Sequence, residues 1–409
     1  MEAHKTVLNN EQIKNKEKSR IFLLIGILLI ASNLRAPLTS VGSLVPAIRG
    51  SLEVSNVVVG FITTLPLLAF ALVSPFSPKV AHRIGMERTI FLSMIVLLTG
   101  IIMRSVTGVG TLFIGTALIG IAISFGNVLL PSFVKTGFPF KIGLITGLYS
   151  VFMNIFGALA SGISVPLSNV GNLGWQGALG AWALLVIIAV FFWFPKLKMS
   201  KDSPKFNQSN KRNRTNMWAS FTAWQITIFM GFQSLMYYTM LTWLPDIILN
   251  YGYSLNEAGW MLSLMLFSAI PLTFIMPIIA DKMNNQQLLG AFTGVIFLLG
   301  VIGLLTGLPS LIIISAILLG VGCGSGFSLS LMFFTLRTKD GYDASELSGM
   351  AQSFGYSLAA IGPVLFGGVH DFTGSWTAPL YMLVLVSIIL LITGWLGGRK
   401  VIIASADEL

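Results

Sequence analysis

The sequence predicts an all-α integral membrane protein with twelve transmembrane helices arranged as two six-helix halves. Hydrophobic residues make up 55% of the 409 residues and charged residues only 10%, whereas a soluble domain carries about 25% charged residues. Apolar runs of about 18 residues or more recur along the chain, and each is long enough to cross a bilayer about 30 Å thick. A polar, basic segment near the middle divides these runs into two sets of six.

The predicted spans follow one another with short connections. They cover residues 20–46, 55–78, 88–106, 110–134, 142–166, 175–195, 218–247, 255–280, 286–307, 309–335, 346–369 and 376–397. The chain then divides into an N-terminal tail (1–19), an N-terminal half (20–195), a basic loop (196–217), a C-terminal half (218–397) and a C-terminal tail (398–409). We expect 1–19 to be an uncleaved cytoplasmic tail, because no small-residue cleavage site follows a short apolar core.

Positive charge predicts the orientation. All but three of the 25 Lys and Arg lie in the tails or in connections on one side, including 79–88 and 196–217; the exceptions are Arg35, Arg49 and Arg104. The positive-inside rule therefore predicts cytoplasmic termini in a multi-pass plasma-membrane protein. The net charge of +10 is explained by orientation and contact with anionic lipid, and no basic folded domain suggests nucleic-acid binding.

Chemistry-bearing motifs are scarce. The only cysteine is Cys323 and the three histidines are scattered, so no metal-ligand spacing, HExxH, GxSxG or Walker pattern is present. We expect neither an enzyme nor an ATP-driven pump, and we expect no metal or other cofactor. The partners we expect are a small-molecule substrate and the lipid bilayer, for a protein that acts as a monomer.

The two halves share landmarks. A shift of 199 residues places Pro46 on Pro245, Ser55 on Ser254, Gly60 on Gly259, Pro78 on Pro277 and Arg83 on Lys282. Helix ends often reuse Ser and Pro, but that explains single matches better than a register held over two spans. The pattern indicates two related halves, as in transporters built from repeats.

Arg35 lies in the middle of the first predicted span. It is about 22 Å along the helix from Arg20, at about 1.5 Å per residue, and a cation at the bilayer centre costs roughly 3 kcal/mol. The residues that share its helical face, at spacings of three and four, are Ser32, Thr39, Gly42 and Pro46. Such a small, polar stripe is expected to face protein or water rather than lipid.

The sequence offers Arg35 no buried counter-ion, because no Asp or Glu occupies the middle third of any predicted span. Two interpretations stay open. Arg35 could bond backbone carbonyls and side-chain amides as a packing element. Alternatively, it is a cation held in a water-filled cavity for an anionic or strongly dipolar substrate, whose planar oxygen-bearing group fits the guanidinium fork.

The architecture resembles the major facilitator superfamily, in which two six-helix halves surround a central cavity. The connection "PKVAHRIGMER" is similar to a gating motif of that superfamily: it keeps Arg83 and Arg88 but has His82 where Asp is usual, while the second copy, "PIIADKM", keeps Asp281. The resemblance implies that His82, Arg83, Arg88 and Asp281 belong to a gate, and His82 departs from its usual pairing.

Several segments resemble the cyanate permease and nitroimidazole transporter branch of this superfamily. They include "SNLRAPLTSVG", "GNVLLPSFVK", "GFQSLMYYTMLTWLP" and "GMAQSFGYSLAAIGP". The resemblance implies transport of a small solute. Taken singly, polar residues on these spans more often serve packing, but together on facing helices they predict a substrate site. Its expected members are Arg35, Asn33, Thr39, Asn127, Asn154, Gln233, Ser234, Tyr237, Gln352 and Tyr356.

We therefore expect a secondary active or facilitative transporter of a small anionic or dipolar solute, working by alternating access. A multidrug exporter is the alternative within transporters, and a non-transporting receptor is the alternative from another class. His370 and Asp371 are the one adjacent titratable pair near a predicted cavity mouth. They could load protons, but capping of the helix end is the interpretation that we favour.

Overall fold

The structure is a computed structural model that describes residues 21–53, 56–106, 108–199 and 216–403. Its described residues form a helical bundle, and residues 21–33 are its first helical segment. The helices up to Met199, here the first set, are α2 (Ala36–Leu52), α3 (Asn56–Val73), α4 (Ser77–Ile84), α5 (Met86–Arg104), α6 (Val109–Gly137), α7 (Ile142–Asn169), α8 (Gly174–Gly180) and α9 (Ala183–Met199). The second set is α10 (Phe221–Asn250), α11 (Leu255–Lys282), α12 (Gln287–Leu305), α13 (Pro309–Leu336), α14 (Gly341–Thr373) and α15 (Thr377–Gly397).

Most helices of the bundle are long enough to cross a membrane. Ten stretches of the described residues are long and apolar enough to span a membrane. The remaining two long helices, α10 with 30 residues and α14 with 33, carry more polar side chains. With these two, the helices match the twelve predicted spans, and the all-α fold class is confirmed.

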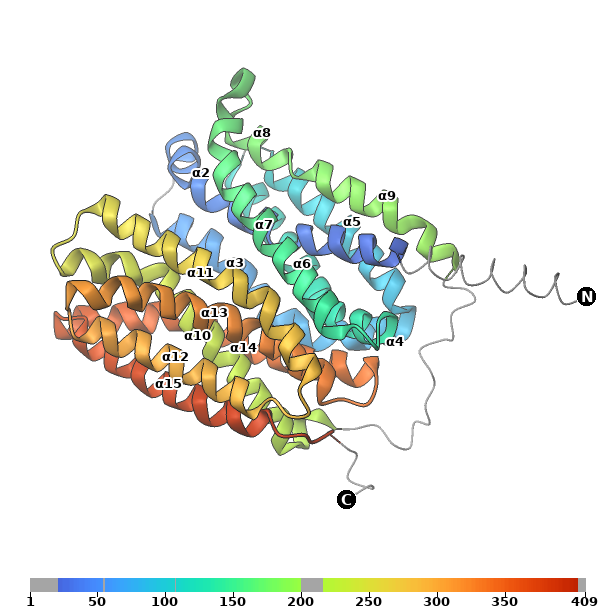
Figure 1. Cartoon of the computed structure of the whole chain (residues 1–409). Coiled ribbons are helices and arrows are strands. Elements are labelled where there is room, and N and C mark those ends of the chain that lie inside the picture. The colour runs from blue at the N-terminus through green and yellow to red at the C-terminus, as the bar shows by residue number, and fades with distance from the viewer. Residues whose placement is uncertain (1–20, 54–55, 107, 200–215, 404–409) are drawn as a thin grey trace, which may run out of the picture.

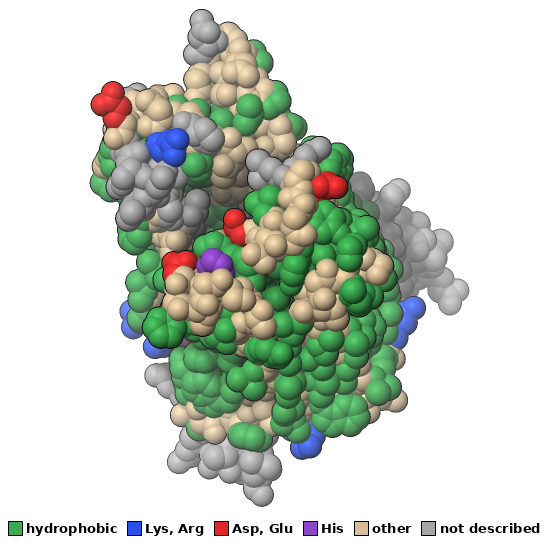
Figure 2. Space-filling view, turned by 90° about the vertical axis from the view of Figure 1, so that its left-hand side faces the viewer, with side chains coloured by type: hydrophobic (Ala, Val, Ile, Leu, Met, Phe, Trp, Pro, Cys, Tyr) green, Lys and Arg blue, Asp and Glu red, His purple; other side chains and the backbone are tan. Residues whose placement is uncertain are grey.

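The two sets lie side by side and each packs mainly within itself (Figure 1). In the first set α5 packs on α6 and α2 on α7, and in the second α10 packs on α14 and α12 on α15. The sets meet chiefly where α7 contacts α11 and where α14 contacts α3 and α6. Figure 2 views the bundle from one end; hydrophobic side chains cover much of the visible surface and charged ones are few.

The structure departs locally from two expectations. The first span, expected over 20–46, is confirmed as long and apolar enough to cross a membrane over Ile21–Val45, but its helix breaks at Leu34 and Arg35 before α2 begins. Pro37 explains the break, because it has no N–H to donate to the carbonyl four residues earlier, that of Asn33, and its ring crowds that carbonyl. The connection expected at 79–88 is mostly helix, since α4 runs to Ile84 and α5 begins at Met86, with Gly85 (φ +93°) making the turn between them.

Candidate substrate site

The helix break places Arg35 at the N-cap of α2. Its backbone is non-helical (φ −124°, ψ −38°), while its carbonyl accepts bonds from the amides of Leu38 (3.0 Å) and Thr39 (3.1 Å) in the first turn. The side chain therefore leaves the chain where two helical segments meet, and it is half-buried.

The guanidinium of Arg35 touches neutral groups from both helix sets. Its Nη1 donates to Oδ1 of Asn154 on α7. The guanidinium carbon lies 5.6 Å from the ring centre of Tyr237 on α10 and 5.9 Å from that of Phe327 on α13. Within the described ranges no carboxylate contacts it, and the ionisable groups nearest to it include the phenols of Tyr237 and Tyr356. A cation–π arrangement of this kind stabilises a desolvated guanidinium without neutralising its charge.

The stem of Arg35 is held by α7. A Cβ added to Gly157 would lie 3.1 Å from both Cγ and Cδ of Arg35, so glycine is what lets the helix approach. The hydroxyl of Thr39 donates to the carbonyl oxygen of Gly157 at 2.7 Å and fixes α2 against α7 beside the cation.

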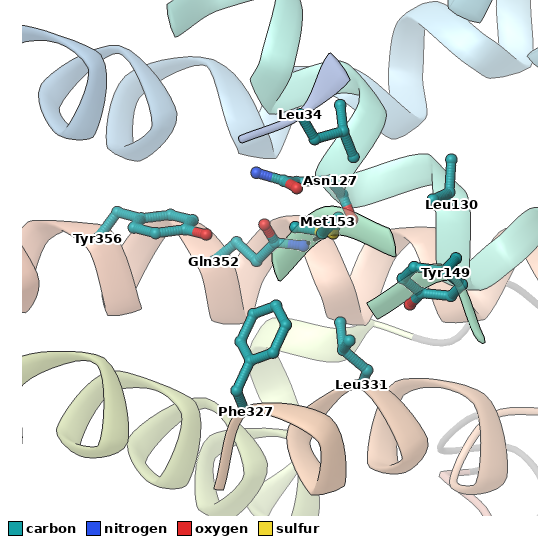
Figure 3. A pocket seen from close by; sticks show the side chains of 9 residues that line it. All are labelled: Leu34, Asn127, Leu130, Tyr149, Met153, Phe327, Leu331, Gln352 and Tyr356. Atoms are coloured by element: carbon teal, nitrogen blue, oxygen red, sulfur yellow. Dashed lines mark hydrogen bonds between the residues drawn. The ribbon is translucent and has the colours of Figure 1, made fainter. Parts of the chain in front are cut away.

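A small cavity, with about 10 Å³ of room for the centres of water molecules, lies beside this cation. Phe327 is common to both, and the cavity draws its lining from four helices and the helix break. Figure 3 shows the lining residues, which are Leu34, Asn127, Leu130, Tyr149, Met153, Phe327, Leu331, Gln352 and Tyr356. The lining is thus aromatic, aliphatic or amide in character, and it contains no charged residue.

Polar groups in the cavity wall bridge the two sets. Nε2 of Gln352 on α14 donates to the backbone oxygen of Asn127 on α6 at 3.0 Å and to the hydroxyl of Ser348 at 2.8 Å. The hydroxyl of Tyr149 is buried and has no hydrogen-bond partner among the described residues. Because a buried hydroxyl without a partner costs free energy, Tyr149 has an unused donor to offer a ligand.

The structure brings six of the ten expected site residues to this region and turns others elsewhere. One of the six is Arg35 itself. Asn154 and Tyr237 contact it, and the cavity lining includes Asn127, Gln352 and Tyr356. Asn33 instead donates to Leu29 O (2.8 Å) and to Leu185 O on α9 (3.3 Å). Gln233 bonds within its own helix to Ser234 at 2.9 Å, and Thr39 serves helix packing.

Sequence reasoning missed two aromatic residues and one cation. Tyr149 and Phe327 lie in apolar runs, so nothing in their spacing separated them from core residues. Arg104, expected at the outer end of the span 88–106, is fully buried, and its Nη1 donates to the carbonyl of Pro37 at 2.7 Å. Its Nε and Nη2 find no hydrogen-bond partner among the described residues.

The two sets are joined at the end of the bundle that carries Lys79, Lys135 and Lys282, here called the basic end. Oδ2 of Asp281 at the end of α11 accepts from the amide of Gly143 in the first turn of α7, at 3.0 Å. Nζ of Lys135 on α6 donates to Thr335 O (2.7 Å) and to both oxygens of Thr338 at the end of α13. An anion at a helix N-terminus and a cation at a C-terminus both match the helix dipole.

The other three expected gate residues have different surroundings at the basic end. The ring of His82 on α4 lies edge-on to Tyr342 on α14, with centres 5.3 Å apart, so it joins the contact between the sets. Arg83 and Arg88 are exposed on the outside of the bundle.

The helix sets separate away from the basic end. A Cβ on Gly143 would lie 2.3 Å from Pro277 O and one on Gly147 would lie 2.8 Å from Phe274 O, but one on Gly162, further along α7, would meet nothing within 4 Å. On α14, a Cβ on Gly349 would lie 2.8 Å from Ser74 O, whereas one on Gly368 would again meet nothing within 4 Å. Close backbone contacts between the sets are thus found near the basic end.

His370 and Asp371 lie at the end of α14, opposite the basic end. His370 Nδ1 is 3.3 Å from Asp371 Oδ1, and the imidazole stacks on Trp376 with ring centres 4.1 Å apart. The Asp371 side chain is 85% exposed. The pair is packed against the turn before α15.

Comparison with known proteins agrees with this geometry. Residues 21–300 and 226–401 match the family described as the Major Facilitator Superfamily, and the chain belongs to it. It is 43% identical to the uncharacterized transporter YycB of Bacillus subtilis, over 96% of this chain and 98% of the relative. It is 39% identical to the 2-nitroimidazole transporter of Escherichia coli (93% and 96%) and 26% identical to the Escherichia coli cyanate transport protein CynX (87% and 91%). The expected branch of the superfamily is thereby confirmed.

A solved structure shows the fold. The proton:xylose symporter XylE bound to 6-bromo-6-deoxy-D-glucose superposes with a TM-score of 0.72 over 92% of this chain and 94% of that one, at 10% identity.

Proposed function

We propose that this chain is a secondary active or facilitative transporter that moves a small anionic or dipolar solute, cyanate-like or nitroimidazole-like, by alternating access. The observation that carries the proposal is the surroundings of Arg35. A permanent cation is held by an amide oxygen and two aromatic rings, beside a cavity without acidic residues. Its charge is therefore available to a ligand.

The chemistry of the site favours a planar ligand with an oxygen-bearing group at one end. The guanidinium fork fits such a group, and the rings of Tyr237 and Phe327 offer flat apolar faces beside it. The amides of Asn127 and Gln352 and the hydroxyl of Tyr149 offer neutral polar contacts further along. The names of the nitroimidazole and cyanate relatives support this substrate class.

Alternating access would move the half at 20–195 against the half at 218–397. In this proposal the basic end is cytoplasmic and closed, so the conformation described here admits substrate from outside. The Asp281–Gly143 and Lys135–α13 contacts would part when the carrier opens inward. The protein would work as a monomer in the plasma membrane, with both termini cytoplasmic and with no cofactor.

The proposal is tested by ligand binding and flux. Purified protein is screened by thermal shift against cyanate, nitrite, small carboxylates and nitroimidazoles, and each ligand that stabilises it is measured in proteoliposomes. Arg35→Gln should abolish binding and flux, and Arg35→Lys should weaken binding at least tenfold, because the point charge lacks the fork (about 1.4 kcal/mol).

The matched control is Arg49→Gln, which removes an arginine from the exposed end of the same helix. It should keep wild-type binding. Full binding by a folded Arg35→Gln protein would refute the site, and binding without flux in the wild type would indicate a receptor instead.

A further inference from the structure

A second hollow lies on the outside of the first helix set. It opens between α4, α5 and α6 and encloses about 200 Å³ of space. Its walls include Val80 and Ile84 from α4, Leu92 and Val96 from α5, and Ile121 and Phe125 from α6. Ile84 and Leu92 are 37% and 50% exposed, so the groove faces the surroundings of the bundle, which in a membrane protein are lipid chains.

The polar atoms inside the groove are already satisfied. The hydroxyl of Thr89 donates to Gly85 O at 2.7 Å, and that of Ser93 donates to Ile90 O at 2.8 Å, both within α5 and its cap. The groove therefore offers an occupant hydrocarbon contact rather than hydrogen bonds.

Two exposed arginines belong to the helices that form this groove and lie next to its lining residues in the sequence. Arg88 precedes Leu92 and Val96 by one and two steps of four residues, so all three share one face of α5. Arg83 adjoins Ile84 on α4, one helical turn after Lys79, and all three basic residues are exposed. The acid of this turn, Glu87, acts electrostatically on Lys196 of α9.

We propose that the groove binds one acyl chain of an anionic phospholipid, with the phosphate held between Arg83 and Arg88. The distance from Arg88 to Val96 along α5 is about 12 Å at about 1.5 Å per residue, so the charge lies at the mouth and the apolar walls lie below it. Phosphate is the group that paired guanidinium forks fit best. A second copy of this chain would bring its own basic end to the same level and would be repelled there.

The test is native mass spectrometry of the full chain, released from detergent after titration with phosphatidylglycerol or phosphatidylcholine carrying identical acyl chains. The wild type should bind phosphatidylglycerol roughly tenfold to thirtyfold more tightly, as expected for two basic groups near a phosphate. The Arg83→Gln/Arg88→Gln double variant should lose this preference. The control double variant Lys282→Gln/Lys400→Gln, which removes two exposed charges of the second set, should keep it.

Val96→Trp, which fills the groove, should weaken retention of both lipids. The proposal is overturned if Arg83→Gln/Arg88→Gln keeps the preference for phosphatidylglycerol, or if both double variants lose it equally. It is also overturned if Val96→Trp disrupts a dimer while lipid retention stays unchanged, because a second copy would then be the occupant.

Discussion

The guanidinium of Arg35 donates a hydrogen bond to the side-chain oxygen of Asn154, which lies 119 residues further along the chain on α7. The amide holds the cation without cancelling its charge, so a carboxylate in its place should do the opposite. Asn154→Asp should pair with Arg35 and lower the affinity for an anionic ligand at least tenfold, about 1.4 kcal/mol. Asn154→Ala should have a smaller effect. Ligand titration by calorimetry distinguishes the two, and equal affinity in Asn154→Asp and wild type would show that substrate does not meet Arg35.

Tyr237 and Gln233, four residues apart on α10, should differ in importance. The ring of Tyr237 faces Arg35 at 5.6 Å, whereas Gln233 bonds to Ser234 in its own helix. Tyr237→Leu should weaken ligand binding several-fold, since a cation–π contact contributes about 0.5–2 kcal/mol. Gln233→Ala should leave affinity unchanged. Tyr237→Phe, which keeps the ring, is the matched control. A loss of affinity in Gln233→Ala alone would reverse the assignment.

Arg104 should matter for stability more than its place at a helix end suggests. Its bond to Pro37 O supports the chain two residues after Arg35. Arg104→Ala should lower the free energy of unfolding by about 3 kcal/mol, because it leaves a cavity and frees a buried carbonyl. Thermal unfolding in detergent measures the change, with exposed Arg49→Ala as the comparison. Identical melting of Arg104→Ala and wild type would mean that this contact contributes nothing.

Locking the basic end should stop transport. A Cβ on Gly341 would lie 2.4 Å from Oγ1 of Thr136, so these positions of α14 and α6 are close enough to cross-link. In a Cys323→Ser background, Thr136→Cys with Gly341→Cys should lose flux under oxidation and recover it with a reductant, while ligand binding persists. Each single cysteine serves as a control. Undiminished flux in the oxidised double variant would argue against separation of the sets at this end.

We expect that transport is not coupled to protons through His370 and Asp371. The imidazole stacks on Trp376 and the carboxylate is exposed, as in a helix-end anchor. Flux in liposomes under an imposed pH gradient at zero membrane potential should ignore the gradient, with a substrate that ionises far from the working pH. His370→Gln should behave like the wild type. Uphill accumulation that disappears in His370→Gln would establish proton coupling through this residue.

The long helices were predictable because hydrophobic length and positive charge are local properties of the sequence. The break at Arg35 was missed, although Pro37 is its signal, because the stripe from Ser32 to Pro46 was interpreted as one uninterrupted helix. Asn33 was placed in the site because the Asn-Leu-Arg segment resembles the transporter branch, whereas its amide donates to Leu185 O on α9. Arg104 was missed because a cation after an apolar run normally marks the membrane surface.

Aromatic site residues were harder to predict for a different reason. Tyr149 and Phe327 have the same spacing whether they line a cavity or fill a core, and only the separation of four neighbouring helices distinguishes these cases. Gln233 and Tyr237 share a helical face in sequence, yet just one of them reaches the cation.

The contacts at the basic end mean that each helix set completes the ends of helices that belong to the other. Asp281 supplies the N-terminus of α7 with an acceptor, and Lys135 supplies the C-terminus of α13 with a donor. If the sets separate at this end, both helix ends lose these partners and are solvated by water. Each lost cap costs about 1 kcal/mol of free energy. Solvent can repay most of that cost, so the two conformations should be close in free energy. In the proposed alternating-access cycle, binding of a small solute would then shift the balance between them.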